Sequence, residues 1–136
     1  MTDITAVYDT NVLISAFIGR GAPYKALDAV YAGKVRLVIS PDMLFEFEDV
    51  LSRPKFHYTD KHIRRILTIV FKVAKVVEPD FSVDVVKEDP SDNRVIEAAL
   101  SGKAKYIVTG DSHLLSLKKV ENIEIISVKN FLRILR

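Results

Sequence analysis

The feature that most constrains the fold is an alternation of short apolar runs with longer segments of helical character. Runs of this length predict strands, while cap residues or an early proline before the longer segments predict helix starts. The expected strands are 4–8, 35–39, 76–77, 106–109 and 123–128. The expected helices are 12–18, 23–31, 41–51, 60–75, 92–101, 112–117 and 130–135, and segment 81–86 is ambiguous, with extended structure as one alternative.

Strands that alternate with helices in this way predict a parallel sheet of about five strands with helices on both faces, a three-layer α/β/α sandwich. A chain of 136 residues is long enough to bury a core and short for two domains. The sequence shows no internal repeat, low-complexity segment or linker. We therefore expect one α/β domain over residues 1–136.

Composition narrows the possible chemistry. The 20 basic residues are nearly balanced by 18 acidic ones, which argues against a binder whose affinity for nucleic acid comes mostly from net charge. The chain has no cysteine, so disulfides, thiol catalysis and cysteine-based zinc sites are excluded.

The sequence also predicts no membrane association. Residues Met1 to Asp3 lead directly into the first strand, without the basic and apolar regions of a signal peptide. The longest apolar-rich segment, 63–77, is interrupted by charged residues such as Arg64 and Lys72, so it is no candidate for a membrane span. A cytoplasmic protein is the simplest interpretation.

Four acidic residues stand just after predicted strands or on helices that follow them: Asp9, Glu46, Asp92 and Asp111. In parallel α/β folds the carboxyl ends of the strands share one edge of the sheet, where such folds keep their sites. Carboxylates roughly 5 Å apart repel by about 3 kcal/mol per pair at an effective dielectric constant of ~20. A group of four therefore requires protonation or a cation, and Mg²⁺ or Mn²⁺ prefers such oxygen ligands.

Helix capping or an ordinary turn is the competing explanation for three of these acids. Asp9 directly precedes a predicted helix, and Asp89 or Asp92 in D-P-S-D-N could simply start the next one. Asp111 belongs to a Gly-Asp turn of a common type. Each signal is weak alone, whereas four acids in matching positions of successive β/α units favour a site.

The remaining candidates are not settled by spacing. Glu46 and Glu48 flank the apolar arc of the helix 41–51 on opposite sides, and an exposed glutamate at the edge of an amphipathic helix explains either one. His113 lies two residues beyond Asp111 and is within reach of the predicted site.

In this order, the acidic segments closely resemble the PIN-domain ribonucleases, above all the toxins of VapBC-like toxin–antitoxin pairs. The resemblance covers essentially the whole chain. It is carried by Y-D-T-N-V-L-I-S-A, L-F-E-F-E-D-V-L-S-R-P-K-F, D-P-S-D-N-R-V-I-E-A-A-L and Y-I-V-T-G-D-S-H-L-L. D-P-x-D-N followed by T-G-D about twenty residues later is specific in combination, whereas D-T-N alone is not.

The resemblance implies a metal site made of Asp9, Glu46, Asp92 and Asp111, and it selects Glu46 over Glu48. It implies further that Thr10, Asn11 and Thr109 orient those carboxylates. The implied strand order is 3-2-1-4-5, with the strands before Asp9 and Asp111 side by side. One departure is His113, which stands where many relatives carry a further acid.

The function implied is a metal-dependent endoribonuclease that hydrolyses phosphodiester bonds of single-stranded RNA with one or two Mg²⁺ or Mn²⁺ ions. A small antitoxin protein is the implied partner. The alternative from another class is a catalytically silent PIN fold that serves as a scaffold for RNA or protein. Two other enzyme classes fit worse: a dehalogenase-type phosphatase needs a carboxylate where Asn11 stands, and a receiver domain needs a lysine for which Lys129 is a doubtful match.

We also expect a homodimer. The predicted helix 60–75 carries apolar residues around more of its circumference than the ~100° stripe that one buried face requires. Surplus apolar surface of this kind marks contacts with another chain, and two-fold symmetry is the commonest arrangement. Burial of the whole helix within one subunit is the alternative.

Overall fold

The structure, a computed structural model, describes residues 4–136. Residues Met1 to Asp3, which belong to the expected domain and to the expected absence of a signal peptide, lie outside this range. The strands are β1 (Thr5–Tyr8), β2 (Arg36–Ile39), β3 (Ala74–Val76), β4 (Tyr106–Val108), β5 (Lys119–Val120) and β6 (Ile123–Ile126). The helices are α1 (Thr10–Ile18), α2 (Ala22–Tyr31), α3 (Pro41–Leu51), α4 (Asp60–Val73), α5 (Pro90–Ser101), α6 (Ser112–Leu117) and α7 (Val128–Ile134), with a short 3₁₀ helix at Pro54–Phe56.

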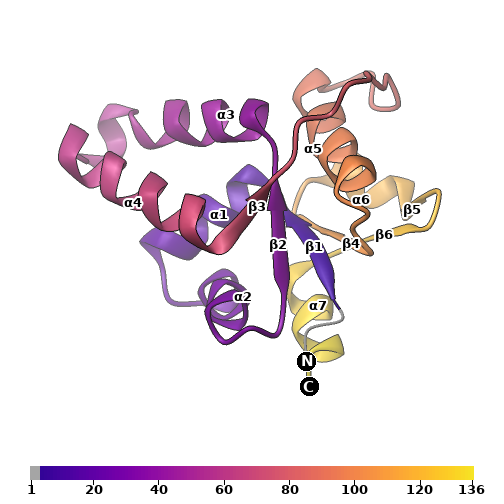
Figure 1. The fold of residues 1–136 in the computed structure, drawn as a ribbon, viewed down its shortest axis with the longest axis horizontal. Helices are drawn as coiled ribbons and strands as arrows, with labels where there is room; N and C mark the ends of the chain where they lie inside the picture. The colour runs from indigo at the N-terminus through magenta and orange to yellow at the C-terminus, as the bar shows by residue number, and fades with distance from the viewer. Residues whose placement is uncertain (1–3) are drawn as a thin grey trace.

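The strands form one sheet in the order β3-β2-β1-β4-β6-β5 (Figure 1). The first five of these strands pair in parallel, which confirms the predicted parallel sheet and its order. The sixth, β5, pairs antiparallel with β6 at the edge and was not predicted. Its two residues, Lys119 and Val120, are too few to give a sequence signal.

Helices cover both faces of the sheet, as the predicted sandwich requires (Figure 1). Helix α5 lies against β1, β2 and β4, whereas α1, α2 and α7 pack together in the other layer. In that second layer, the Tyr8 hydroxyl of β1 donates a hydrogen bond of 2.9 Å to the Ala26 carbonyl of α2. The ring of Phe131 on α7 contacts Tyr8 and Tyr106 edge-on, with centroids 5.8 and 5.6 Å away. These contacts fix α2 and α7 next to each other over the central strands.

Helix α4 ends earlier than predicted. It stops at Val73, and the chain becomes extended at Ala74, so that β3 covers Ala74–Val76 instead of 76–77. The cause is pairing with the neighbouring strand, because Leu37, Val38 and Ile39 of β2 align with these three residues. Tertiary pairing therefore overrides the helical pattern, which continues to Lys75 in the sequence.

Two other boundaries differ. The strand predicted over 123–128 ends at Ile126, because the Ser127 hydroxyl accepts a hydrogen bond from the Asn130 amide and caps α7. The ambiguous segment 81–86 forms no regular strand or helix. In the part of the chain that the structure describes, no helix has both the length and the apolar character needed to cross a membrane.

Candidate metal centre

Asp9 and Asp111 follow the two central strands at the same edge of the sheet. Tyr8 of β1 is aligned with Val108 of β4, and the Asp9 amide donates to the Val108 carbonyl at 3.0 Å. The Thr109 hydroxyl donates a hydrogen bond of 2.6 Å to Asp9 Oδ2 and accepts one of 3.0 Å from the Asp111 amide. Although Asp9 precedes α1, its side chain makes no capping hydrogen bond. The backbone amides of Thr10 and Asn11 lie near enough to this carboxylate to oppose the rise in pKa that burial causes, and its side-chain partner is Thr109 at the end of the neighbouring strand.

Asp92 reaches the same region from the first turn of α5. The cap of this helix is Asp89, which accepts hydrogen bonds from the amide and the hydroxyl of Ser91 at 3.1 and 2.7 Å. Asp92 itself is only 4% exposed, and its Oδ2 atom is buried without a hydrogen-bond partner. Helix capping therefore does not explain Asp92, and a buried carboxylate oxygen without a partner requires another explanation.

Asp111 has two functions at once. Its Oδ1 atom accepts hydrogen bonds from the amides of His113 and Leu114 at 2.8 and 3.1 Å, which caps α6. Its carboxylate also belongs to a close group with Asp92 and His113, in which one ligand atom of each lies within 4.8 Å of the others. His113 Nδ1 is 3.8 Å from Asp111 Oδ1. Asp111 therefore caps α6 and at the same time lies in the close group with Asp92 and His113.

Glu46 approaches the site from α3. Its carboxylate is half-buried and lies near enough to Asp9 for their charges to interact, with the Thr10 hydroxyl beside it. Glu48 is exposed and lines a different surface of α3. The fold therefore brings Glu46, and not Glu48, into the electrostatic range of Asp9.

Burial and repulsion by neighbouring carboxylates disfavour the ionised forms of Asp92, Asp9 and Glu46. Burial, followed by the charges of Asp111, Asp89 and Asp9, raises the pKa of Asp92 to about 8. Burial also raises the pKa of Asp9, although its hydrogen bond from Thr109 acts in the opposite direction. The pKa of Glu46 is raised by burial and then by the charge of Asp9. In the absence of a cation, the centre therefore holds protons that isolated carboxyl groups would release.

The other predicted residues differ in burial and in their distance from the carboxylates. Thr10 and Thr109 are buried beside the carboxylates, whereas Asn11 is exposed. His113 has a side chain that is 48% exposed, so it borders the centre from the solvent side. The charge of Asp9 acts on Asp92 and Asp111, whereas Glu46 responds to the charges of Asp9 and Asp89. Neither Asp9 nor Glu46 is part of the 4.8 Å cluster found among residues 4–136.

Two further residues support the centre and were not singled out from the sequence. Asn93 is buried, and its Oδ1 accepts hydrogen bonds from the amides of Val85 and Val86 while its Nδ2 donates to the Val86 carbonyl. Glu97, one turn later, accepts from the Val83 amide at 2.9 Å and pairs with Arg94 at 3.0 Å. Their spacing of four residues, one turn of a helix, was the available signal, because such residues share one helix face.

The donor set fits a divalent cation. Carboxylate oxygens are the preferred ligands of Mg²⁺ and Mn²⁺, and an imidazole nitrogen is compatible with several transition metals. The buried Asp92 Oδ2 atom has no hydrogen-bond donor to satisfy it, which is the state expected of a ligand atom whose partner is an ion. A bound cation would also offset the charge repulsion that, after burial, raises the pKa values of Asp92, Asp9 and Glu46.

The sequence defines the class of protein. The family model described as PIN domain matches residues 5–113, and the chain therefore belongs to the PIN-domain family. All four acids of the candidate centre lie within this range. No curated protein matches the sequence.

Solved structures confirm the fold. A chain of VapBC2 from Rickettsia felis, in a complex bound to a promoter DNA fragment, has a TM-score of 0.63 at 15% identity, covering 91% of this chain and 98% of that chain. PAE2754 from Pyrobaculum aerophilum has a TM-score of 0.60 at 19% identity, with 97% and 88% covered. The PIN domain endonuclease Utp24 has a TM-score of 0.54 at 18% identity, with 90% and 84% covered.

Proposed function

We propose that this PIN-domain protein is a metal-dependent endoribonuclease that hydrolyses phosphodiester bonds of single-stranded RNA. The observation that carries the proposal is the buried, unpartnered Asp92 Oδ2 atom in a group of acids at the sheet edge. A site of this kind is costly for a fold unless a cation is bound there. The similarity in fold to Utp24, described as an endonuclease, is consistent with it.

We assign the ion to Asp9, Asp92 and Asp111, with Glu46 completing the group of ligands or positioning a water molecule. One or two Mg²⁺ or Mn²⁺ ions, when bound, would offset the charge on the scissile phosphate and lower the pKa of the attacking water. The chain supplies the rest: Thr109 holds the Asp9 carboxylate, and α5 presents Asp92 from a buried position. His113 is assigned to the solvent side of the centre, where its imidazole can orient Asp111 or a water molecule.

Cleavage of single-stranded RNA in the presence of Mn²⁺ or Mg²⁺ tests the proposal directly. Asp9→Asn, Asp92→Asn and Asp111→Asn keep the side-chain shape, so each variant should fold. Each should lose activity by at least about 100-fold, a loss that even supporting residues of metal sites can cause. EDTA should abolish cleavage by the parent protein. Undiminished cleavage by all three variants would show that the nuclease activity lies elsewhere.

The choice between the two glutamates of α3 gives a matched pair of variants. Glu46→Gln should lower the rate of cleavage, because the Glu46 carboxylate lies in the electrostatic range of Asp9. Glu48→Gln should leave the rate unchanged, because Glu48 lies on an exposed part of the same helix. Equal rates for the two variants would remove Glu46 from the proposed site.

The proposed biological role is that of a toxin paired with a small antitoxin protein. The similarity in fold to a VapBC2 chain supports this role. Co-expression with the product of a neighbouring small reading frame, followed by purification of the tagged chain, would detect such a partner. Growth arrest on expression of this chain alone, relieved by the partner, is the expected result.

The alternative is a PIN fold that binds RNA or protein without catalysis. The presence of all four acids argues against it, because a scaffold has no use for a group of carboxylates at one sheet edge, where the pKa values of Asp9, Glu46 and Asp92 are raised. Binding of RNA without cleavage, in the presence of Mn²⁺ that measurably stabilises the protein, would favour the scaffold.

A homodimer is the proposed assembly. An apolar groove of about 200 Å³ lies between α3 and α4, lined by Leu44, Phe45, Leu67 and Phe71 together with Pro41 and Glu48. Phe45 is 72% exposed and Phe71 58% exposed. Two exposed aromatic rings in one apolar groove favour a contact with a second copy.

A further inference from the structure

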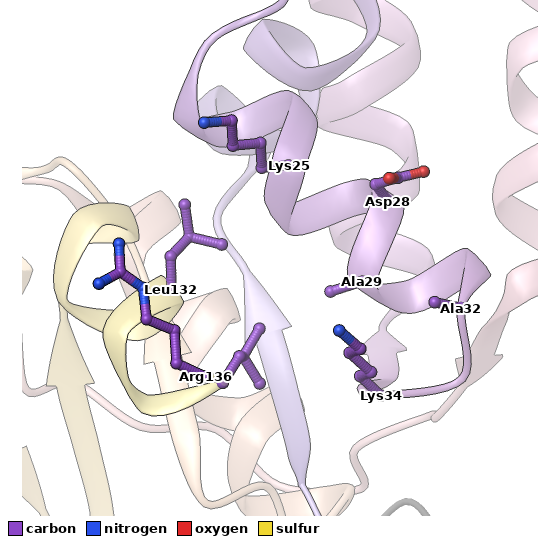
Figure 2. Close-up of a pocket in the computed structure, with 8 residues that line it drawn as sticks. Lys25, Asp28, Ala29, Ala32, Lys34, Leu132 and Arg136 are labelled. Carbon is purple, nitrogen blue, oxygen red and sulfur yellow. The ribbon is translucent and has the colours of Figure 1, made fainter.

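A basic cleft lies between α2 and α7, in the layer opposite α5. It consists of two connected hollows of about 370 and 490 Å³ that share Lys25, Leu132 and Arg136. Figure 2 shows Lys25 on α2 and Arg136, just beyond the end of α7, at the two sides of the first hollow, with Lys34 below α2. The basic side chains that line the two hollows are Arg20, Lys25, Lys34, Lys129, Arg133 and Arg136.

The cleft is far more basic than the rest of the protein. Six basic side chains line it and one acid, Asp28, does so. Over the whole chain the basic residues exceed the acidic ones by only two, so the rest of the molecule carries more acids than bases. Among the described residues, none of the six basic side chains forms a salt bridge. The cleft therefore concentrates positive charge that the fold leaves available for an external anion.

The shape of the cleft favours a chain of phosphates over a single one. Its basic residues come from three separate segments and extend through both hollows. Tyr24, beside Lys25, is 39% exposed, and the Arg20 guanidinium lies 5.8 Å from its ring centre. A basic groove beside an exposed aromatic ring is the arrangement by which proteins bind single-stranded nucleic acid without reading its sequence.

The cleft is also connected to the edge of the sheet that carries the candidate metal centre. Ile126, the last residue of β6, is aligned with Val108 of β4, and its carbonyl accepts a hydrogen bond from the Thr109 amide. Helix α7 starts two residues later, and its first turn carries Lys129. The Lys129 end of the cleft therefore lies at the same edge of the sheet as the centre.

We propose that the cleft between α2 and α7 binds the phosphate backbone of single-stranded RNA outside the scissile site. The choice of RNA as the nucleic acid rests on the proposed ribonuclease function. A second basic surface, on α4, is lined by Lys61, Arg64, Arg65 and Lys72. We do not assign RNA to it, because its charges come from one helix and form the polar face that an amphipathic helix normally exposes. It supplies the matched control.

The test is binding of a fluorescein-labelled single-stranded RNA, measured by fluorescence anisotropy in EDTA over a series of salt concentrations. Lys25→Ala/Arg133→Ala should weaken binding and make the dependence of log K on log salt shallower by ~1.4, since each neutralised phosphate of a single strand contributes ~0.7. Tyr24→Ala should weaken binding on the order of tenfold without changing this slope. The control, Arg64→Ala/Lys72→Ala, should bind as the parent protein does.

Several outcomes would overturn the inference. One is an unchanged affinity and slope in the cleft variant, and another is an equal loss in the α4 control. Loss of binding to poly-glutamate with undiminished binding to RNA would assign the cleft to an acidic protein segment instead. The cleavage assay separates the two proposals. If the parent protein cleaves RNA and the cleft variants bind RNA as the parent does, only the assignment of RNA to the cleft is rejected. Weakened binding in the cleft variants of a protein that cleaves no RNA supports the cleft and rejects the ribonuclease.

Discussion

Thr109 lies between the two acids that follow the central strands and makes a hydrogen bond with each of these residues. Its hydroxyl donates to Asp9 Oδ2 at 2.6 Å and accepts from the Asp111 amide at 3.0 Å. Because Thr109 is fully buried, its rotamer is fixed by packing, and the Asp9 carboxylate is held in one orientation. A single hydroxyl thus sets the geometry of two residues of the candidate centre.

Replacing this hydroxyl should affect metal binding more than the fold. Thr109→Val keeps the shape but removes both hydrogen bonds, and we expect it to weaken Mn²⁺ binding by about 10- to 100-fold. Thr109→Ser retains the hydroxyl and should restore most of the affinity. Isothermal titration calorimetry with Mn²⁺ measures both variants. Equal affinities of the valine and serine variants would show that the hydroxyl does not orient Asp9.

The raised pKa values predict how stability depends on pH. The folded-state pKa of Asp92 is about 8, above its usual value near 4, so the metal-free native state retains a proton that the unfolded chain releases. The free energy of unfolding should therefore decrease as the pH rises from about 4 to about 8, and Asp9 and Glu46 act in the same direction. Bound Mn²⁺ should reverse part of this loss, because it stabilises only the folded, ionised centre.

Urea unfolding at several pH values, in EDTA and in Mn²⁺, measures this dependence. Asp92→Asn should flatten the curve in EDTA and reduce the effect of Mn²⁺. Asp84→Asn is the control, since the Asp84 side chain is 74% exposed and pairs with Lys87, which is not a residue of the centre. A steep decrease that persists in the Asp92 variant would assign the titration to other groups.

The four acids could be predicted as candidates from the sequence, but the hydrogen bonds that orient their side chains could not. Asp9 and Asp111 were predictable because a residue that follows a buried strand is placed at the sheet edge by the strand itself. The choice of Glu46 came only from the family resemblance, since periodicity treated Glu46 and Glu48 alike. The role of Asn93 was not predicted, because its partners are backbone groups seven or eight residues away. The pattern of side chains in the sequence does not indicate hydrogen bonds to the backbone.

Side-chain hydrogen bonds, and not a strand ladder, connect α5 to the irregular segment before it. Asn93 and Glu97 together supply partners for the amides of Val83, Val85 and Val86. These bonds replace the pairing that a strand would provide, which explains why a β-rich sequence between residues 81 and 86 forms no strand. They also fix the path of the chain into Asp89, the cap of α5.

Removing this connection should destabilise the protein. Asn93→Ala leaves two buried or half-buried amides and the Val86 carbonyl without partners, and we expect a loss of about 2–4 kcal/mol in the free energy of unfolding. Urea unfolding measures the loss, and hydrogen exchange at Val85 and Val86 should accelerate most. Asn122→Ala, at an exposed position, is the control and should change little. Similar stabilities of the two variants would contradict the role given to Asn93.

The element boundaries show which parts of the fold the sequence could specify. Central strands were predicted closely, because β1, β2 and β4 are apolar runs that are buried on both faces. The edge was less predictable: β3 takes three residues from the expected end of a helix and the strand after it, because β2 offers a free edge for pairing. Local propensity decides the centre of this sheet, and long-range pairing decides its borders.

The basic cleft and the apolar groove lie on different parts of the molecule. The basic cleft lies between α2 and α7, whereas the apolar groove lies between α3 and α4. A protein that assembles through the groove would leave the cleft uncovered for nucleic acid. The two proposals are therefore compatible, and each can be tested without disturbing the other.

The parent protein should assemble as a homodimer through the apolar groove. Phe71 is 58% exposed on α4 and lines the apolar groove with Phe45 of α3, so burying the two rings in a contact between copies removes apolar surface from water. Analytical ultracentrifugation of the parent protein at micromolar concentrations should give the mass of two chains. Phe71→Glu should give the mass of one folded chain, because a charge in the apolar contact has no partner there. Phe81→Glu, at a ring that is 41% exposed outside the groove, should remain dimeric. A parent protein with the mass of one chain would refute the dimer, and a dimeric Phe71→Glu variant would show that the copies meet through another surface.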